Sequence, residues 1–477
     1  MREESGGNPI RDMIFSSIGE NTDLIRTGRL SPVELMEASL NEIDQQESRL
    51  NAFISVFRDE SLVQARQAEI DSRAGENSGP LHGIPIALKD LIDVAGRPTT
   101  CGSKFYGAGS TARSDSTITR RLKQAGAIII GKTNLHEFAF GVTTENPHYG
   151  STANPWDTSR VPGGSSGGSG AAVSAGLCAG ALGTDTGGSV RIPSALCGIA
   201  GLKPTYGRIS VLGVTELARS LDCAGPMCRR VGDIAIMMNV LAGPDPDDAL
   251  CSTEPAPDYT HGLEHPVDGL KAGIPNQHFY SDLDPEVERA VREAIKTVEA
   301  LGVEIVEIDL PSVHDVYEVV LTLLMAEASY YHQRYLAENR DDYGRDVREI
   351  LEAGQKLNAM DYIRAERIRE DASRTFARAF EEVDILLTPT VPVPAPHRTL
   401  DDPSVESESN KIRPRMTQNT RIFNLLGLPA LSVPCGFTGQ GLPVGLQIAG
   451  AWWSEKTLLQ VGNAYERATP WHTMRPE

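Results

Sequence analysis

Several features that would assign a location or a partner are missing from this chain of 477 residues. No run of eighteen apolar residues occurs, so we expect no membrane-spanning helix. Residues 1–9 lack the apolar stretch of a signal peptide. The seven cysteines include no Cys-x-x-Cys pair, and their odd number argues against a complete disulfide framework. We therefore expect reduced thiols and a cytoplasmic location.

Positive charge is also scarce. The 45 Lys and Arg residues are outnumbered by 64 Asp and Glu residues, which gives a formal net charge of -19 at pH 7. This excess argues against nucleic acid or an anionic membrane as a partner and favours a small neutral substrate. The ten histidines show no metal-binding spacing, since His136 and Glu137 are adjacent rather than one helical turn apart. We predict no metal site.

What the sequence does contain is an alternation of helical and apolar segments. An amphipathic helix opening at Asp284 separates apolar strands at 270–274 and 303–310, which is a β-α-β pattern. Such alternation predicts an α/β fold with helices on both faces of a sheet. No repeat or low-complexity linker divides the chain, so we expect one domain over 1–477. Its expected parts are a loose tail (1–10), N-terminal helices (11–75), a core (76–310) with a Gly-, Ala- and Ser-rich region (150–207), a helical insertion (312–382) and the C-terminal part of the core (383–477).

Two glycine-lined serine segments lie in the region rich in small residues, at 163–168 and 184–189. Ser165 in the first segment and Ser189 in the second are 24 residues apart. Glycine lets backbone N–H groups crowd around a small charged centre, because no Cβ stands in the way. Several N–H groups that point one way can hold an oxyanion. The two segments therefore look like parts of one site.

Lys89 is the candidate base of that site. It ends the apolar run at 84–88, which predicts a buried strand. Burial lowers the pKa of a lysine, and a lysine that is neutral near pH 7 can accept a proton. The alternative is a solvated surface charge. For Asp185 and Arg191 we expect an ion pair that braces the turn rather than direct chemistry.

Two well-known patterns also match parts of the chain. Residues 126–133 fit the phosphate-binding loop, but their central Ala-Ile-Ile-Ile belongs inside a sheet, so we reject nucleotide binding. Residues 164–168 fit the Gly-x-Ser-x-Gly nucleophile elbow. That elbow needs a preceding strand, which the sequence before it does not favour, and a later histidine. An α/β-hydrolase triad with His397 or His472 as its base is therefore the weaker hypothesis.

Several blocks of the sequence, in order and with matching spacing, resemble the amidase signature family of serine hydrolases that cleave C–N bonds. The blocks are residues 83–90, 131–138, 154–169, 183–193, 201–207 and 428–434. The resemblance covers nearly the whole chain. It implies a single α/β/α domain in which a large mixed, mostly parallel sheet lies between helical layers.

The resemblance also implies residue roles. Ser189 would be the acyl-forming nucleophile, Ser165 the bridging serine after a cis peptide from Gly164, and Lys89 the base at the end of the relay. The implied oxyanion hole consists of the backbone amides of Thr186, Gly187, Gly188 and Ser189. No metal or organic cofactor is required. The complete Lys-Ser-Ser set argues against a fold used only for binding.

The family contains free-standing amidases and a glutaminyl-tRNA amidotransferase subunit that works in a complex. The segments 140–144 and 326–332 depart from the pattern of that subunit. We therefore favour a free-standing monomer or homodimer that hydrolyses small aryl or alkyl amides, with carbamates or ureas as further substrates. The alternative is an amidotransferase-type subunit that releases ammonia from glutamine.

Substrate choice is expected to depend on the segment that begins at Phe138 and on the helical insertion. Phe138, Phe140 and Gly141 are the predicted substrate-binding residues, and Tyr330 and Tyr331 are further candidates for an apolar pocket. The alternative is that several of these aromatic residues belong to the core.

Overall fold

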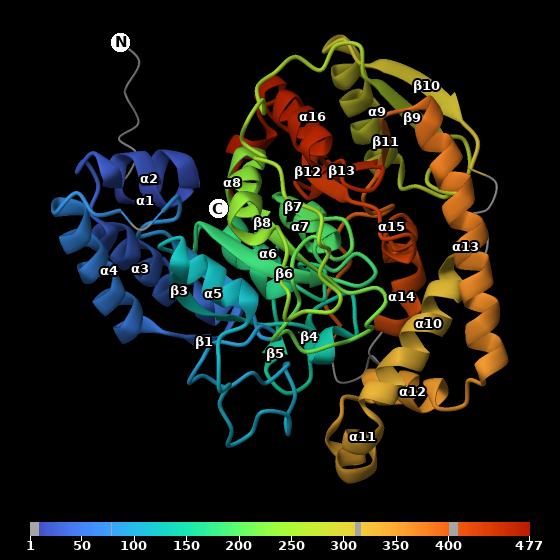
Figure 1. The fold of residues 1–477 in the computed structure, drawn as a ribbon, viewed down its shortest axis with the longest axis horizontal. Helices are drawn as coiled ribbons and strands as arrows, with labels where there is room; N and C mark the ends of the chain where they lie inside the picture. The colour runs from blue at the N-terminus through green and yellow to red at the C-terminus, as the bar shows by residue number, and fades with distance from the viewer. Residues whose placement is uncertain (1–8, 78, 311–315, 400–408) are drawn as a thin grey trace.

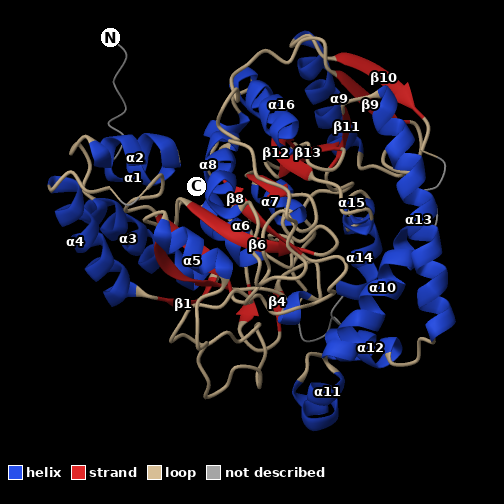
Figure 2. Cartoon of the chain, viewed as in Figure 1, coloured by secondary structure: helices blue, strands red, loops and turns tan. Residues whose placement is uncertain are grey.

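The computed structural model describes residues 9–77, 79–310, 316–399 and 409–477. Its centre is one mixed sheet of eleven strands with helices on both faces (Figure 1, Figure 2). The strands of this sheet are β1 (Phe53–Val56), β2 (Pro85–Lys89), β3 (Ile128–Thr133), β6 (Gly180–Asp185), β7 (Ala200–Lys203), β8 (Cys223–Cys228), β9 (Lys271–Pro275), β10 (Glu304–Ile308), β11 (Ile385–Pro389), β12 (Ala430–Phe437) and β13 (Pro443–Gly450). A separate hairpin pairs β4 (Glu145–Asn146) with β5 (Gly150–Ser151).

The helices begin and end as follows. The α-helices are α1 (Pro9–Phe15), α2 (Ile18–Arg26), α3 (Pro32–Leu50), α4 (Arg58–Arg73), α5 (Thr117–Gln124), α6 (Gly167–Ser174), α7 (Arg191–Cys197), α8 (Val231–Leu241), α9 (Pro285–Ala300), α10 (Val316–Tyr331), α11 (Gln333–Asn339), α12 (Arg345–Gly354), α13 (Ala359–Glu382), α14 (Ser409–Met416), α15 (Arg421–Leu425) and α16 (Glu455–Ala468). Short 3-10 helices are η1 (Glu137–Ala139), η3 (Arg340–Asp342) and η4 (Trp471–Thr473).

The strands lie in the spatial order β1-β3-β2-β6-β8-β7-β12-β13-β11-β9-β10. Parallel pairing is confined to β3-β2-β6 and β11-β9-β10, and the six other neighbouring pairs are antiparallel. The expected mixed sheet between helical layers is confirmed, with less parallel pairing than the resemblance implied. One reason is the connection between β12 and β13. Residues 438–442 are too short a link to join parallel strands, and an apolar run does not reveal strand direction.

Both faces of the sheet are buried, as β2 demonstrates. Ile86 and Leu88 pack in a core cluster with residues of α5 and α8, whereas Ala87 packs in a second cluster with residues of α6. Side chains alternate between the two faces of a strand, so a strand covered on both faces is apolar throughout. This explains the continuous apolar run that precedes Lys89. It also explains how the lysine is carried into the interior.

The outer parts of the chain differ from expectation in two places. The predicted N-terminal helices are α1 to α4, but β1 interrupts them and pairs with β3 at the edge of the sheet. The predicted tail at 1–10 lies outside the described residues except for its last two, which begin α1. The predicted helical insertion corresponds to α10–α13, and its first residues, 312–315, lie outside the described part. Helix α13 packs beside α10 at the side of the sheet (Figure 1).

The segment that matches the phosphate-loop pattern is part of the sheet. Residues Ile128–Thr133 form β3, which is buried along its whole length between β1 and β2. Lys132 forms an ion pair with Asp90 inside the core. The backbone amides of this segment belong to the sheet, so the rejection of nucleotide binding at this pattern is supported.

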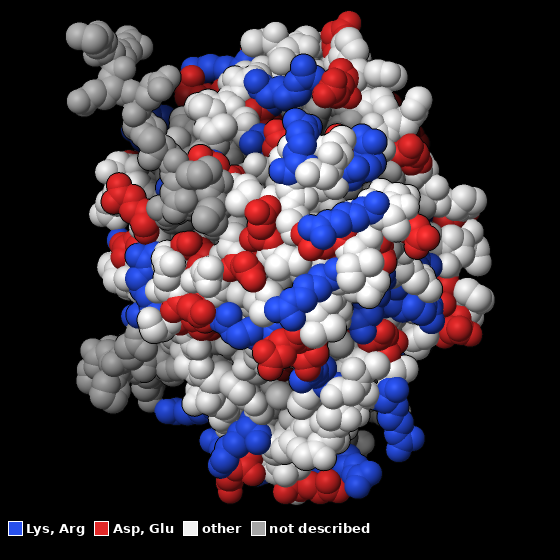
Figure 3. All heavy atoms as spheres, turned by 90° about the vertical axis from the view of Figure 1, so that its left-hand side faces the viewer, with Lys and Arg blue, Asp and Glu red and all other residues white. Residues whose placement is uncertain are grey.

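Three expectations from the composition can be compared with the structure: surface charge, membrane-spanning helices and the state of the cysteines. On the face that carries the N-terminal helices, basic and acidic side chains are interspersed (Figure 3). No helix in the described ranges is both long and apolar enough to cross a membrane. All seven cysteines are unpaired and six are buried. The six buried cysteines therefore act as core residues here.

Candidate active site

Lys89 ends β2 in the interior of the molecule. Its Nζ donates hydrogen bonds to Ser165 Oγ at 2.7 Å and to Thr184 Oγ1 at 2.8 Å. Both partners are neutral, and no ion pair among the described residues includes this lysine. Burial lowers the pKa of Lys89 to about 7, although the charges of Asp222 and Asp185 act in the opposite direction. A neutral amine at this position can accept a proton.

Ser165 follows a cis peptide bond from Gly164, as the resemblance implies. Its hydroxyl accepts the hydrogen bond from Lys89, and its carbonyl oxygen accepts hydrogen bonds from the backbone of His136 and the hydroxyl of Thr144. The serine is fully buried just before the start of α6. These contacts hold its backbone on one side and its hydroxyl on the other.

Ser189 closes the turn that follows β6. Its carbonyl oxygen accepts a hydrogen bond from the amide of Ser166 at 3.3 Å, which ties the two serine segments together. The residue is 8% exposed, so it is reached from the surface more easily than Ser165. The structure therefore brings Lys89, Ser165 and Ser189 into one site.

A buried ion pair between Asp185 and Arg191 braces the turn at 184–189. We call the side of the turn that carries this pair its inner side. Asp185 accepts hydrogen bonds from Arg191 Nε at 3.0 Å and Arg191 Nη2 at 2.9 Å, and from the amide of Gly188 at 2.8 Å. Arg191 also donates to Asn424 and Gln447. Burial raises the pKa of Asp185, but the charge and hydrogen bonds of Arg191 outweigh it and hold that pKa well below its ordinary value. The expected bracing role of this pair is supported.

The amides expected to form an oxyanion hole are not equivalent. Gly188 is the exception, because its N–H already donates to Asp185 and points to the inner side of the turn. A Cβ at Gly188 would lie 2.3 Å from Thr420 Oγ1, and its φ of +130° also favours glycine. Within the described part of the chain, the amides of Thr186, Gly187 and Ser189 donate to no acceptor. Three amides of the turn thus remain available.

Asp222 is a member of the site that no sequence pattern singles out. Its carboxylate accepts hydrogen bonds from Thr186 Oγ1 at 2.5 Å and from the amides of Leu217 and Ala218. Burial raises the pKa of Asp222 to about 7. It lies 33 positions after Ser189 and in no recognisable motif, so only the pairing of β6 with β8 brings it to the site. Thr184 belongs to a block of the resemblance, but its contact with Lys89 appears only in the structure.

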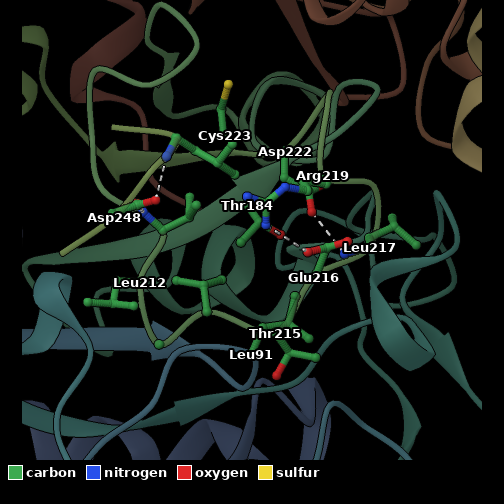
Figure 4. A pocket seen from close by; sticks show the side chains of 14 residues that line it. Leu91, Thr184, Leu212, Thr215, Glu216, Leu217, Arg219, Asp222, Cys223 and Asp248 are labelled. Carbon is green, nitrogen blue, oxygen red and sulfur yellow. Dashed lines mark hydrogen bonds and ion pairs between the residues drawn. The ribbon is translucent and has the colours of Figure 1, made fainter. Parts of the chain in front are cut away.

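A cavity of about 230 Å³ adjoins the relay on the side of Thr184 and Asp222 (Figure 4). The segment 211–219 supplies most of its other walls, together with Leu91. The cavity is thus lined by the end of β6, the start of β8, the loop between 211 and 222, and two residues of a further loop, Asp248 and Leu250. Thr184, which lines the cavity, also accepts a hydrogen bond from Lys89, so the cavity lies close to the buried lysine.

The predicted substrate-binding residues do not line this cavity. Phe138 is 1% exposed and packs against the rings of Phe105 and Tyr343, and Phe140 is 2% exposed. Gly141 sits against His136, whose ring a Cβ would meet at 2.3 Å. Tyr330 is 82% exposed. Phe138 and Phe140 therefore pack in the core, as the alternative states. Their role in substrate binding stays a prediction, because an apolar ring fits a core and a pocket equally well.

The side chains of two histidines that the sequence singles out make other contacts. His136 contacts Asp346, and His397 lies beside Ser159. No strand occurs between residues 152 and 166, so the elbow hypothesis lacks its structural context. Among the described residues, no group of three His, Cys, Asp or Glu side chains could hold a metal ion.

Known proteins share both the sequence and the fold of this chain. The model of the Amidase family matches residues 34–459. A glutamyl-tRNA(Gln) amidotransferase subunit from Chloroflexus aggregans is 43% identical, with 95% of this chain and 96% of that protein covered. An amidase of Pseudomonas putida is 42% identical, with 95% and 96% covered. The native peptide amidase of Stenotrophomonas maltophilia has the same fold, with a TM-score of 0.82, 30% identity, and 97% and 98% coverage.

Proposed function

Because this chain belongs to the Amidase family, we propose that it hydrolyses the C–N bond of small amides through an acyl-enzyme on Ser189. The observation that carries the proposal is the chain of contacts from Lys89 to the two serine segments. A buried Lys89, whose pKa burial lowers to about 7, lies 2.7 Å from Ser165 Oγ, and the segment of Ser165 is tied to Ser189. A free serine hydroxyl is a weak nucleophile, so such a base is what the chemistry needs.

The first step moves two protons and forms one bond. Lys89 Nζ takes the proton of Ser165, Ser165 Oγ takes the proton of Ser189, and Ser189 Oγ attacks the carbonyl carbon. The carbonyl oxygen becomes an oxyanion opposite the amides of Thr186, Gly187 and Ser189. Removing one such donor typically costs about 2.7–4 kcal/mol in the barrier.

The second step releases the amine. The C–N bond breaks as the nitrogen receives the proton that returns from Lys89 through Ser165. Water then attacks the acyl-enzyme, with the same relay accepting its proton, and Ser189 is regenerated. The chain's own residues supply every proton transfer, and small aryl or alkyl amides satisfy this scheme, as do carbamates and ureas.

The second candidate is an amidotransferase-type subunit that releases ammonia from glutamine. The names of the similar proteins favour it over the free-standing enzyme, since a relative at 43% identity is called a glutamyl-tRNA(Gln) amidotransferase subunit. The amidase of Pseudomonas putida, at 42%, supports the free-standing alternative almost equally. Glutamine is itself an amide, so both candidates use the same chemistry and differ in substrate and partner.

The shared chemistry is tested with a fluorophosphonate. Intact-protein mass spectrometry is expected to find one adduct on the wild-type chain and none on Ser189→Ala. Ser110→Ala, at an exposed serine, is the matched control and should be labelled like the wild type. An adduct that persists in Ser189→Ala would contradict the assignment.

The two candidate functions can be distinguished by the substrates that the chain hydrolyses and by whether it needs a partner. A panel of simple anilides, carbamates, ureas and glutamine is given to the purified chain, and its size is measured by gel filtration. Rapid turnover of anilides by an unaccompanied chain supports the free-standing amidase. Turnover of glutamine alone, or dependence on an added partner, supports the amidotransferase type.

A further inference from the structure

Arg421 is a buried arginine without a carboxylate in contact. It is 5% exposed, its Nη1 has no hydrogen-bond partner, and no ion pair includes it among the described residues. Its guanidinium lies over the ring of Tyr317, with Cζ 4.1 Å from the ring centroid. Buried charges are normally paired, because removing an ion from water is costly. An unpaired guanidinium in this position therefore points to a partner that arrives from outside.

The neighbouring Arg191 shows what a structural arginine looks like here. It is fully buried, and its guanidinium donates to a carboxylate, two side-chain amides and a backbone carbonyl. Arg421 has no comparable set of acceptors. Burial lowers the pKa of Arg421 to about 10 and the charge of Arg413 adds to the decrease, whereas Tyr317 and Glu318 oppose it. At neutral pH the guanidinium still carries its positive charge.

Arg421 lies beside Gly187, the partly exposed position of the turn at 184–189. We call this the outer side of the turn. A Cβ built on Gly187 would be 3.6 Å from Arg421 Cγ, and Thr420 Oγ1 donates to the carbonyl of Gly187 at 2.6 Å. Gly187 is the partly exposed residue of that turn, whose other members are buried. The site is thus open to solvent next to this arginine.

A cavity of about 520 Å³ reaches Arg421 from the surface. Tyr317, Thr417 and Gln418 line it along with the arginine. The cavity is separate from the one beside Thr184, which none of these residues lines. Arg421 is the residue that lies both in this cavity and beside Gly187, so a charged group in the cavity can reach the guanidinium next to the turn.

We propose that Arg421, supported by Tyr317, forms a subsite for a carboxylate on the acyl part of the amide substrate. The guanidinium presents a planar fork of donors that fits a carboxylate through two parallel hydrogen bonds. The ring of Tyr317 covers the guanidinium, whose Nη1 has no partner among the described residues. The proposal rests on the proposed amide hydrolysis, and it replaces a fully neutral substrate by one with a neutral scissile amide and an anionic end.

The test compares two anilides of equal length with the full chain. One is the mono-anilide of succinic acid, which ends in a carboxylate, and the other is the anilide of butyric acid, which ends in a methyl group. The wild type is expected to prefer the succinic compound. Arg421→Met is expected to lower kcat/KM for it by about 10- to 100-fold, mainly through KM, and to change the butyric compound by less than about 3-fold.

A second variant and a binding measurement distinguish the loss of a carboxylate contact from a general loss of folding. Arg421→Lys keeps the charge but loses the paired hydrogen bonds, so an intermediate loss is expected. In Ser189→Ala, the succinic compound should raise the melting temperature, and a further Arg421→Met change should abolish that rise. Both measurements are made on protein whose unfolding midpoint in urea has been compared with that of the wild type.

Each other result overturns the subsite. An equal loss for both anilides assigns Arg421 a role in shaping the turn, and no loss for either places the carboxylate elsewhere. Equal wild-type rates for the two anilides would also exclude it. If neither anilide reacts and the fluorophosphonate leaves no adduct, the proposed hydrolysis itself has failed, and that outcome is distinguishable from a failed subsite.

Discussion

The two sides of the turn at 184–189 are built in opposite ways. On the inner side, Asp185 and Arg191 join the amide of Gly188 and side chains from two distant segments in a closed set of hydrogen bonds. On the outer side, the amide of Gly187 has no acceptor in the described chain, and Arg421 Nη1 has no hydrogen-bond partner there. One side holds the turn in shape, and the other leaves donors without a partner in the described part of the chain.

The difference follows from what each side must do. Donors that stabilise an oxyanion act best when they are already oriented and need not be released from another partner. Orientation requires a rigid support, and a buried bidentate ion pair with all its hydrogen bonds made provides one. The unpaired groups are therefore tolerated because the paired groups behind them are complete. Substitutions on the two sides should consequently have different effects on activity and on stability.

The largest effect is expected from the relay that serves the outer side. Lys89→Met should lower kcat/KM by about 10²–10⁴-fold, because the base is lost. In the wild type, the rate should rise as the pH increases through about 7, since only the deprotonated amine accepts a proton. Lys89→Arg, which stays protonated, should be as inactive as Lys89→Met. A pH-independent rate between about pH 5 and 9 would contradict the role of Lys89 as a base.

Breaking the inner side should damage stability as well as activity. Asp185→Asn keeps the shape of the side chain but leaves the buried charge of Arg191 uncompensated, which should cost about 3–5 kcal/mol in the free energy of unfolding. Urea denaturation followed by tryptophan fluorescence measures this change. Lys89→Met should not show it. A stability equal to that of the wild type would mean that the pair is not a brace.

Two adjacent glycines test the comparison within the turn itself. Gly188→Ala should destabilise the protein by about 1–3 kcal/mol, because its Cβ would lie 2.3 Å from Thr420 Oγ1 and its φ is positive. Gly187→Ala should change stability by less than about 1 kcal/mol, since its Cβ would be 3.6 Å from Arg421 Cγ. The unfolding midpoints of the two variants decide the matter. Equal midpoints would remove the distinction between inner and outer positions.

The smallest effect is expected at Asp222. Its negative charge raises the pKa of Lys89, so Asp222→Asn should lower that pKa and shift the acidic limb of the pH–rate profile to lower pH by about 0.5–1 unit. The hydrogen bond from Thr186 loses its charged acceptor, which should also lower the maximal rate, by about 10-fold. A shift of the limb to higher pH, or no shift, would show that the charge of Asp222 does not reach the lysine.

Much of the site can be predicted from the sequence because its signals are local. The apolar run that ends at Lys89 forms β2, and the glycine-rich turn at Ser189 follows β6. The N-cap at Asp284 is recognisable for the same reason, since a cap needs only a few neighbouring residues. The substrate pocket cannot be predicted in this way, because an aromatic residue in a sequence carries no sign of whether its ring faces a cavity or the core.

The sequence by itself therefore determined the family and the local elements that carry Lys89, Ser165 and Ser189, and the relay through these residues stays a prediction. Only the tertiary structure decided the direction of the central strands, the engagement of Gly188 with Asp185, and the arrival of Asp222 at Thr186. It also placed Arg421 beside Gly187, 234 positions away in the chain. Helix caps and glycine turns depend on neighbours in the chain, whereas these contacts depend on which distant surfaces pack together.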